Sequence, residues 1–170
     1  MKIYLAGPIF NQREVGVMTA IQGICHEAGA ETFSPYHASQ PIWNGRAPKD
    51  CSDEERRQVL QQNIDYIHWC DILLCVLNRG GDYDGRTDTG VVWEMGYANA
   101  LGTFTLGFLD PEVDLPQKGL NLMLAGTIDA VVASYTDLTD AMAMIMDDRR
   151  DVLQDTYTIE SVLSHEKDPI

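Results

Sequence analysis

Residues 71–101 read DILLCVLNRGGDYDGRTDTGVVWEMGYANAL, and this stretch decides the fold. From Asp71 to Leu77 every position after the aspartate is apolar, which is typical of a strand covered on both faces of a parallel sheet. Residues 78–88 are rich in glycine and aspartate and predict a loop, and residues 89–101 predict a helix. A strand, a loop and a helix in this order form one unit of a βαβ fold.

The same alternation continues on both sides of this stretch. Further strands are predicted at residues 2–6, 31–34, 103–109 and 129–134. Further helices are predicted at residues 13–28 and from Ser52 or Asp53 to about residue 68, where only the choice of Ser52 as cap gives a capping box, with Glu55. We therefore expect a three-layer α/β sandwich with a five-stranded parallel sheet, which binds ligands beyond the carboxyl ends of its strands.

The segment between the second strand and the next helix carries three prolines, at positions 35, 41 and 48. Proline disfavours regular structure, so the sequence predicts a long loop here, and long loops in small domains are often functional. Its aromatic side chains either stack on a ligand or pack at the periphery; they are Tyr36, His37 and Trp43.

The composition is that of a folded protein, with 170 residues, 45% hydrophobic and 22% charged. This length predicts a single domain over residues 1–170. From about residue 137 the chain carries nine acidic and three basic residues, and we expect an acidic tail of one or two surface helices.

The formal net charge of −14 argues against several partners. A surface of this sign repels phosphate backbones and anionic lipids, so we expect no nucleic-acid partner and no membrane partner. The four cysteines lack metal-ligand spacing, and the apolar run at the N-terminus is too short for a signal sequence. We expect a reduced, cytoplasmic protein without a metal.

Glu94 is the most informative residue for chemistry. Its neighbours one helical turn away carry no charge that could pair with the carboxylate; they are Gly90, Val91, Tyr97 and Ala98. An unpaired carboxylate on an apolar helix face is costly unless it reaches a pocket, and it is then a candidate nucleophile. A salt bridge to Arg79 or Arg86 is the alternative. Asp88, at the start of the same helix, has the alternative role of a helix cap.

The chain resembles the nucleoside 2-deoxyribosyltransferase family over roughly residues 1–135. Four separated pieces carry this resemblance: Lys2-Ile-Tyr4-Leu-Ala-Gly7-Pro8, the strand beginning at Asp71, Asp88-x-Gly90-x-x-Trp-Glu94-Met-Gly96-x-Ala98, and Asn121-Leu122-Met123. The resemblance implies a flavodoxin-like sheet, a role in nucleoside salvage, and a homo-oligomer, dimeric or higher, whose subunits share active sites.

The resemblance also implies residue roles. Glu94 would attack the anomeric carbon to form a covalent deoxyribosyl ester, and Tyr4 would orient it. Asp71 would protonate the leaving base, and Asp88 would hold the sugar 5′-hydroxyl together with Asn121 of a neighbouring subunit. The pocket would also be lined by Gly7 and Phe10. The ordinary alternatives are a core tyrosine for Tyr4, a turn for Asp71 and a helix cap for Asn121.

The reaction that the resemblance implies is the exchange of bases on 2′-deoxyribose, with deoxynucleosides and free nucleobases as substrates. It needs a carboxylate below the sugar and a proton donor near the base, but no cofactor. One rival is an N-glycosidase that hydrolyses deoxynucleoside 5′-monophosphates, although Asp88 would repel a phosphate there while Arg86 lies close to it in sequence. Another rival is a nucleoside-binding domain without catalysis.

Overall fold

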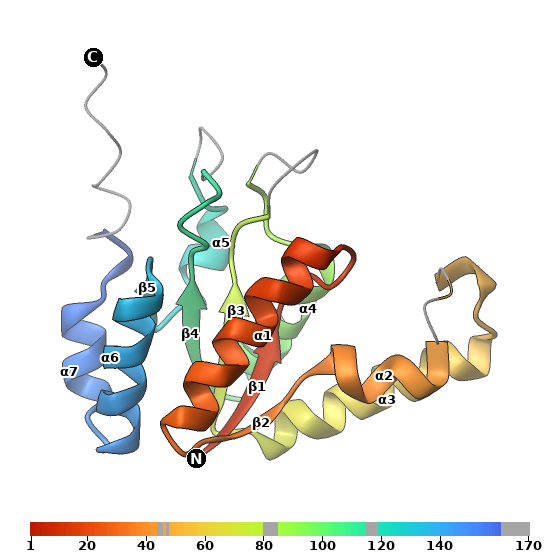
Figure 1. Ribbon diagram of the computed structural model, residues 1–170, viewed down its shortest axis with the longest axis horizontal. Helices are drawn as coiled ribbons and strands as arrows, with labels where there is room; N and C mark the ends of the chain where they lie inside the picture. Colours follow the sequence, from red (N-terminus) through yellow and green to blue (C-terminus); the bar gives the residue numbers. More distant parts are fainter. Residues whose placement is uncertain (44–45, 47, 80–84, 115–118, 161–170) are drawn as a thin grey trace.

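The computed structural model describes residues 1–43, 46, 48–79, 85–114 and 119–160 (Figure 1). The strands are β1 (Lys2–Ala6), β2 (Glu31–Phe33), β3 (Ile72–Val76), β4 (Phe104–Phe108) and β5 (Ala130–Val132). The helices are α1 (Gln12–Glu27), α2 (Pro35–Trp43), α3 (Asp53–Trp69), α4 (Thr89–Ala100), α5 (Leu122–Ala125), α6 (Tyr135–Met146) and α7 (Arg150–Thr156), with a 3-10 turn, η1, at Pro48–Asp50.

The five strands form one parallel sheet in the order β2-β1-β3-β4-β5. Every neighbouring pair is parallel, and β3 lies at the centre between β1 and β4. The chain moves outward from β1 in one direction to β2 and in the other direction to β3, so the order reverses between β1 and β3. This is the flavodoxin-like arrangement, and the predicted α/β sandwich with five parallel strands is confirmed.

Alternating side chains of each strand enter two hydrophobic cores, one on each face of the sheet. On β1, Ile3 and Leu5 enter the core beneath α1, α6 and α7, whereas Tyr4 and Ala6 enter the core beneath α3 and α4. Figure 1 shows α1 on one face and α3 and α4 on the other. The same alternation therefore places Tyr4 on the face that carries α4.

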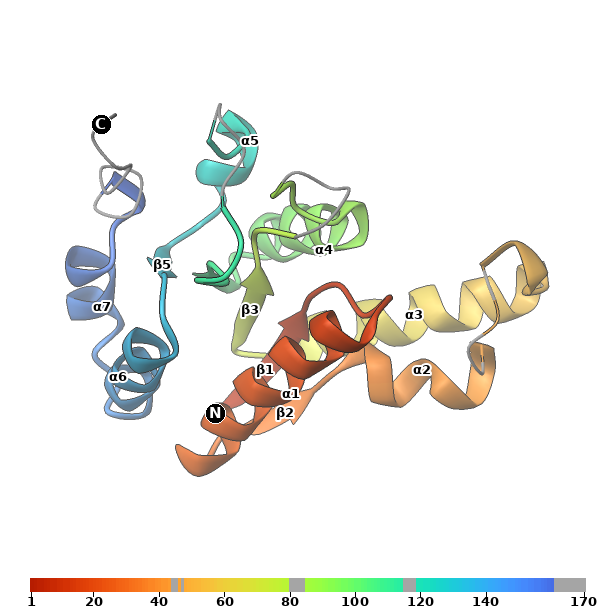
Figure 2. The same cartoon turned by 45° about the horizontal axis from the view of Figure 1, so that its top comes forward.

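The segment at 35–48 differs from its prediction as one long loop, since residues 35–43 form the helix α2. Pro35 is the first residue of this helix, where a missing N–H costs nothing, and the amide of Ala38 donates to the carbonyl oxygen of Ser34. Figure 2 shows α2 and α3 side by side, extending away from the sheet. The side chain of Trp43 and residues 44–45 and 47 lie outside the described part of the structure.

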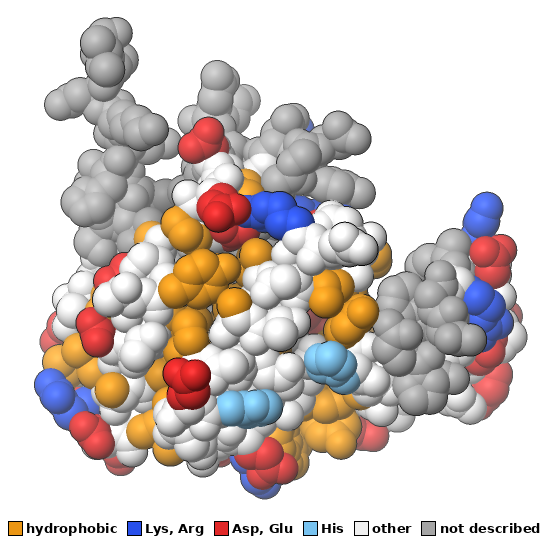
Figure 3. Space-filling model, viewed as in Figure 1, with side chains coloured by type: hydrophobic (Ala, Val, Ile, Leu, Met, Phe, Trp, Pro, Cys, Tyr) orange, Lys and Arg blue, Asp and Glu red, His pale blue; other side chains and the backbone are white. Residues whose placement is uncertain are grey.

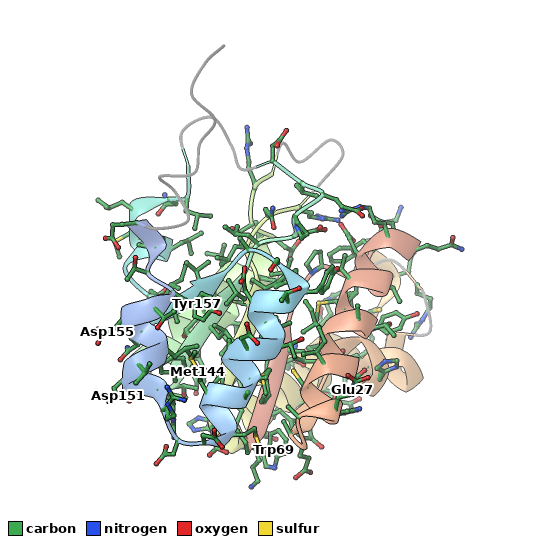
Figure 4. All side chains as sticks on the ribbon, turned by 60° about the vertical axis from the view of Figure 1, so that its left-hand side comes forward. Glu27, Trp69, Met144, Asp151, Asp155 and Tyr157 are labelled. Atoms are coloured by element: carbon green, nitrogen blue, oxygen red, sulfur yellow. The ribbon has the colours of Figure 1, made fainter. Side chains whose placement is uncertain are left out.

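The C-terminal helices contribute to the core as well as to the surface. Helix α6 buries Leu138 and Ile145 against α1 and the sheet, and α7 buries Leu153. Asp151 and Asp155 lie on the outer side of α7 (Figure 4). The acidic segment is thus helical, but its apolar face packs on the sheet, which is more than the predicted surface role.

Acidic side chains lie among hydrophobic and uncharged ones on the face of the molecule shown in Figure 3. Within the described ranges, no helix has the length and apolar character needed to cross a membrane.

Candidate active site

A cavity of about 270 Å³ lies beyond the carboxyl ends of β1 and β3, close to the point where the strand order reverses. Its walls come from the loop after β1, from α2, from the outer half of α3 and from the beginning of α4. The lining residues used below are Gly7, Phe10, Val59, Asn63, Asp88 and Glu94. Glu94, Asp88, Gly7 and Phe10 thus line one pocket.

Glu94 is held by a residue of the central sheet. The hydroxyl of Tyr4 donates a hydrogen bond of 2.6 Å to Glu94 Oε1, and both side chains are buried, with Glu94 8% exposed. Among the described residues Glu94 has no salt bridge, and no hydrogen bond involves its second oxygen, Oε2. The arrangement fixes one carboxylate oxygen and leaves the other for a ligand in the pocket.

Burial makes Glu94 harder to ionise than an ordinary glutamate. Desolvation raises its pKa to about 7; the hydrogen bond from Tyr4 lowers it, and the charge of Asp88 raises it. The pKa of Tyr4 is raised above its usual value by its own burial and by Glu94, so its hydroxyl stays protonated and remains a donor. Near neutral pH, Glu94 is therefore a poorly solvated carboxylate in balance with its acid, a state suited to nucleophilic attack.

Asn63 is a site residue that the sequence reading missed. Its Nδ2 lies 3.4 Å from Glu94 Oε1 and donates to it, whereas its Oδ1 is buried and has no partner among the described residues. The signal in the sequence was the spacing along α3: Asn63 lies four residues after Val59 and four before the buried Ile67, on the inward face of the helix. A side-chain amide on the buried face of a helix needs a hydrogen-bond partner, which indicates a polar site there.

Asp88 caps α4 and also lines the pocket. As the N-cap of α4, its Oδ1 accepts a hydrogen bond of 2.8 Å from the amide of Gly90. Its Oδ2 lies 3.4 Å from Nη1 of Arg79, and the residue lines the pocket. Its carboxylate is thereby fixed at the positive end of the helix dipole.

Asp71 is not brought to this pocket. It precedes β3, so it lies at the opposite edge of the parallel sheet from the loops that follow β1 and β3. There its exposed carboxylate accepts a hydrogen bond of 2.8 Å from the amide of Lys2. Figure 4 shows Trp69, two residues earlier, at that edge. The expected role of Asp71 as proton donor to the leaving base does not fit this position.

Asn121 also lies outside the pocket of its own chain. It is the N-cap of α5 and accepts a hydrogen bond of 2.9 Å from the amide of Met123. Asn121 is exposed, and so are its neighbours Leu122 and Met123, at 86% and 77%. The helix-cap alternative is therefore present, and a role at the pocket requires a second copy of the chain.

Two further observations concern metal ligands and the aromatic residues of α2. No group of three or more His, Cys, Asp or Glu side chains in the described part of the chain is arranged to hold a metal ion. The aromatic residues Tyr36 and His37 pack edge to face with each other and are not among the residues that line the cavity.

Comparison with known proteins places this fold and pocket in a family. The family model described as nucleoside 2-deoxyribosyltransferase matches residues 3–123, which include every pocket residue discussed above. The chain belongs to the nucleoside 2-deoxyribosyltransferase family. Comparison with curated proteins finds no match.

Solved structures of similar fold include both transferases and a glycosidase. A 2-deoxyribosyltransferase of Bacillus psychrosaccharolyticus is 26% identical, with a TM-score of 0.67, over 82% of this chain and 91% of that one. A 2-deoxyribosyltransferase of Leishmania mexicana is 20% identical, with a TM-score of 0.57, over 84% and 96% of the two chains. A CMP N-glycosidase of Clostridium botulinum is 17% identical, with a TM-score of 0.52, over 85% and 99%. The family match supports an enzyme of the nucleoside 2-deoxyribosyltransferase kind, and the two structures that are 20% and 17% identical show that the fold is shared.

Proposed function

We propose that this protein transfers 2-deoxyribose between nucleobases through a covalent ester on Glu94. The observation that carries the proposal is the buried Glu94 at the pocket wall, with Oε1 fixed by Tyr4 and Oε2 without a hydrogen bond to any described residue. Such a carboxylate is preorganised for attack at an anomeric carbon, and it forms no salt bridge with a cationic side chain of the described residues.

In the first half-reaction, Glu94 Oε2 forms a bond to the anomeric carbon while the bond from that carbon to the base nitrogen breaks. The electron pair of the broken bond leaves with the base, which takes a proton from solvent. In the second half-reaction, a ring nitrogen of another base attacks the same carbon and releases the Glu94 carboxylate, and the incoming base loses its proton. Asp71 has no part in this scheme because it lies at the other edge of the sheet.

The two ends of the pocket fit the two parts of a nucleoside. Asp88, near Glu94, is a hydrogen-bond acceptor for the sugar 5′-hydroxyl. The wall formed by α2 and α3 carries the apolar side chains of Ile42 and Val59, which suit a flat base, and also the charged side chains of Glu55 and Arg56. Asn63 lies beside Glu94, where it would contact the base next to the N-glycosidic bond.

The proposal extends to a shared site. Asn121 with its exposed apolar neighbours on α5 would reach the 5′-hydroxyl in the pocket of a second copy, which makes a homo-oligomer part of the proposed function.

The deciding experiment incubates the protein with deoxyinosine and adenine, and separately with deoxyuridine and thymine, and follows the products by chromatography. Formation of the new deoxynucleoside supports the transferase. Release of free base alone, above all from 5′-monophosphates, would favour an N-glycosidase, and binding without turnover would favour a nucleoside-binding domain. Labelling by a slow 2-fluoro-substituted deoxynucleoside should add one sugar unit to the peptide that holds Glu94.

A further inference from the structure

Three charged side chains form a connected group at the edge of the pocket, and two of them have no role in the scheme above. Arg79 Nε donates to Glu14 Oε1 at 2.5 Å, and Arg79 Nη1 lies 3.4 Å from Asp88 Oδ2. Glu14 comes from α1, Arg79 follows β3, and Asp88 caps α4. The side chains of Glu14 and Arg79 are only 5% and 7% exposed, so solvent screens their charges weakly.

The ion pair of Glu14 and Arg79 also holds the aromatic wall of the pocket. Glu14 Oε2 accepts a hydrogen bond of 2.7 Å from the amide of Phe10, and the Arg79 guanidinium carbon lies 4.8 Å from the centre of the Phe10 ring. Phe10 and Asp88 both line the cavity. The pair therefore contacts both residues that would flank the sugar 5′ end.

The net charge of this group decides which substituent can enter beside Asp88. The formal charges of Glu14, Arg79 and Asp88 alone sum to one negative charge. A hydroxyl is accepted there, whereas a phosphate monoester, with about −1.5 to −2 charges at neutral pH, is repelled. Loss of Glu14 alone makes the group neutral, loss of Arg79 alone makes it doubly negative, and loss of both restores one negative charge.

We propose that Glu14, acting through Arg79, is a specificity-determining residue that makes the pocket select nucleosides with a free 5′-hydroxyl over their 5′-monophosphates. The assignment of the sugar 5′ end to Asp88 rests on the proposed function. Glu14 is a positioning residue in this account, since it contacts Arg79 and Phe10 rather than the ligand.

The test measures Kd by calorimetry for a carbocyclic 2′-deoxynucleoside and its 5′-monophosphate, which the enzyme cannot cleave. The quantity of interest is the ratio of the two Kd values. Relative to wild type, Glu14→Gln should shift the ratio toward the monophosphate by about tenfold or more, and Arg79→Gln should shift it the opposite way by a similar factor. The double variant Glu14→Gln/Arg79→Gln should return close to the wild-type ratio.

A purely structural role would weaken both ligands alike and leave the ratio unchanged in all variants, which would overturn the proposal. Arg150→Gln on α7 removes one positive charge, as Arg79→Gln does, and should keep the wild-type ratio. If Glu14→Gln fails to fold, the comparison of Arg79→Gln with the double variant still decides, because equal ratios there contradict the charge account. If the binding ratios behave as expected but true nucleosides are not turned over, the proposed function alone is wrong. If wild type binds neither ligand, both proposals are overturned.

Discussion

At the residue scale, the burial of Glu94 has a consequence for stability as well as for chemistry. Its pKa of about 7 in the folded protein exceeds the usual 4.5, so the folded state binds this proton more tightly than the unfolded state. This contribution to stability is fully present below about pH 4.5 and is lost as the pH rises through 7. The active carboxylate is thus formed at the expense of folding free energy, as is common for groups at functional sites.

Replacing the carboxyl group by an amide should therefore abolish transfer and stabilise the fold. Glu94→Gln keeps an oxygen for the Tyr4 hydroxyl but has no charge to desolvate. We expect a free energy of unfolding about 1–3 kcal/mol above wild type at pH 8, and a smaller difference at pH 5. Urea denaturation at both pH values measures this, and equal or lower stability of the variant at pH 8 would contradict the burial account.

The same titration should appear in the kinetics. Because the nucleophile is the carboxylate, kcat/KM of wild type should rise with pH through about 7 as Glu94 loses its proton. Tyr4→Phe removes the hydrogen bond that lowers this pKa, so the rise should move to higher pH while the variant remains folded. A pH profile with the same midpoint in both proteins would exclude Tyr4 as the residue that tunes Glu94.

At the element scale, α3 supports one wall of the pocket and is fixed at its start by a capping box. The amide of Glu55 donates to Ser52 Oγ at 3.2 Å, and the amide of Ser52 donates to Glu55 Oε2 at 2.7 Å. Of the two caps that the sequence left open, Ser52 and Asp53, the structure has Ser52, which is the one that gives the capping box.

Ser52→Ala should lower the free energy of unfolding by about 1 kcal/mol, because one amide of the first turn loses its acceptor. Catalysis should change little, since Asn63 lies three turns along the helix, held near Glu94. Urea denaturation and the transfer assay together check this. Gln61→Ala, at an exposed position of the same helix, is the control and should stay within about 0.5 kcal/mol of wild type.

At the scale of the whole molecule, the proposed site is composite. Glu94→Ala and Asn121→Ala should each be inactive or nearly so, but a mixture of them whose subunits exchange should regain activity. In a dimer, half of the molecules would be hybrids with one intact site of two, which gives about a quarter of the wild-type rate. Verified exchange without recovery, or full activity of an isolated monomer, would show that Asn121 is only the cap of α5.

How much of this the sequence reveals depends on the range of the interactions involved. The apolar run after Asp71 and the βαβ alternation predicted all five strands within one or two residues of their ends, because these patterns are local. The prolines at 35, 41 and 48 predicted a loop where α2 forms, but proline is well tolerated at the first position of a helix, which Pro35 occupies.

The sequence by itself determined the strands of the sheet, the start of α3 at Ser52 or Asp53, and the absence of a charged partner for Glu94 on its own helix face, since each follows from spacing within one segment. Only the tertiary structure decided which side chains from separate segments lie together. It placed Asp71 at the far edge of the sheet and brought Asn63 to Glu94 in its place. It also joined Glu14, Arg79 and Asp88, which come from three separate segments, into one charged group. Such contacts depend on strand direction and on the register of helices against the sheet. Neither can be derived from the spacing of residues within one segment.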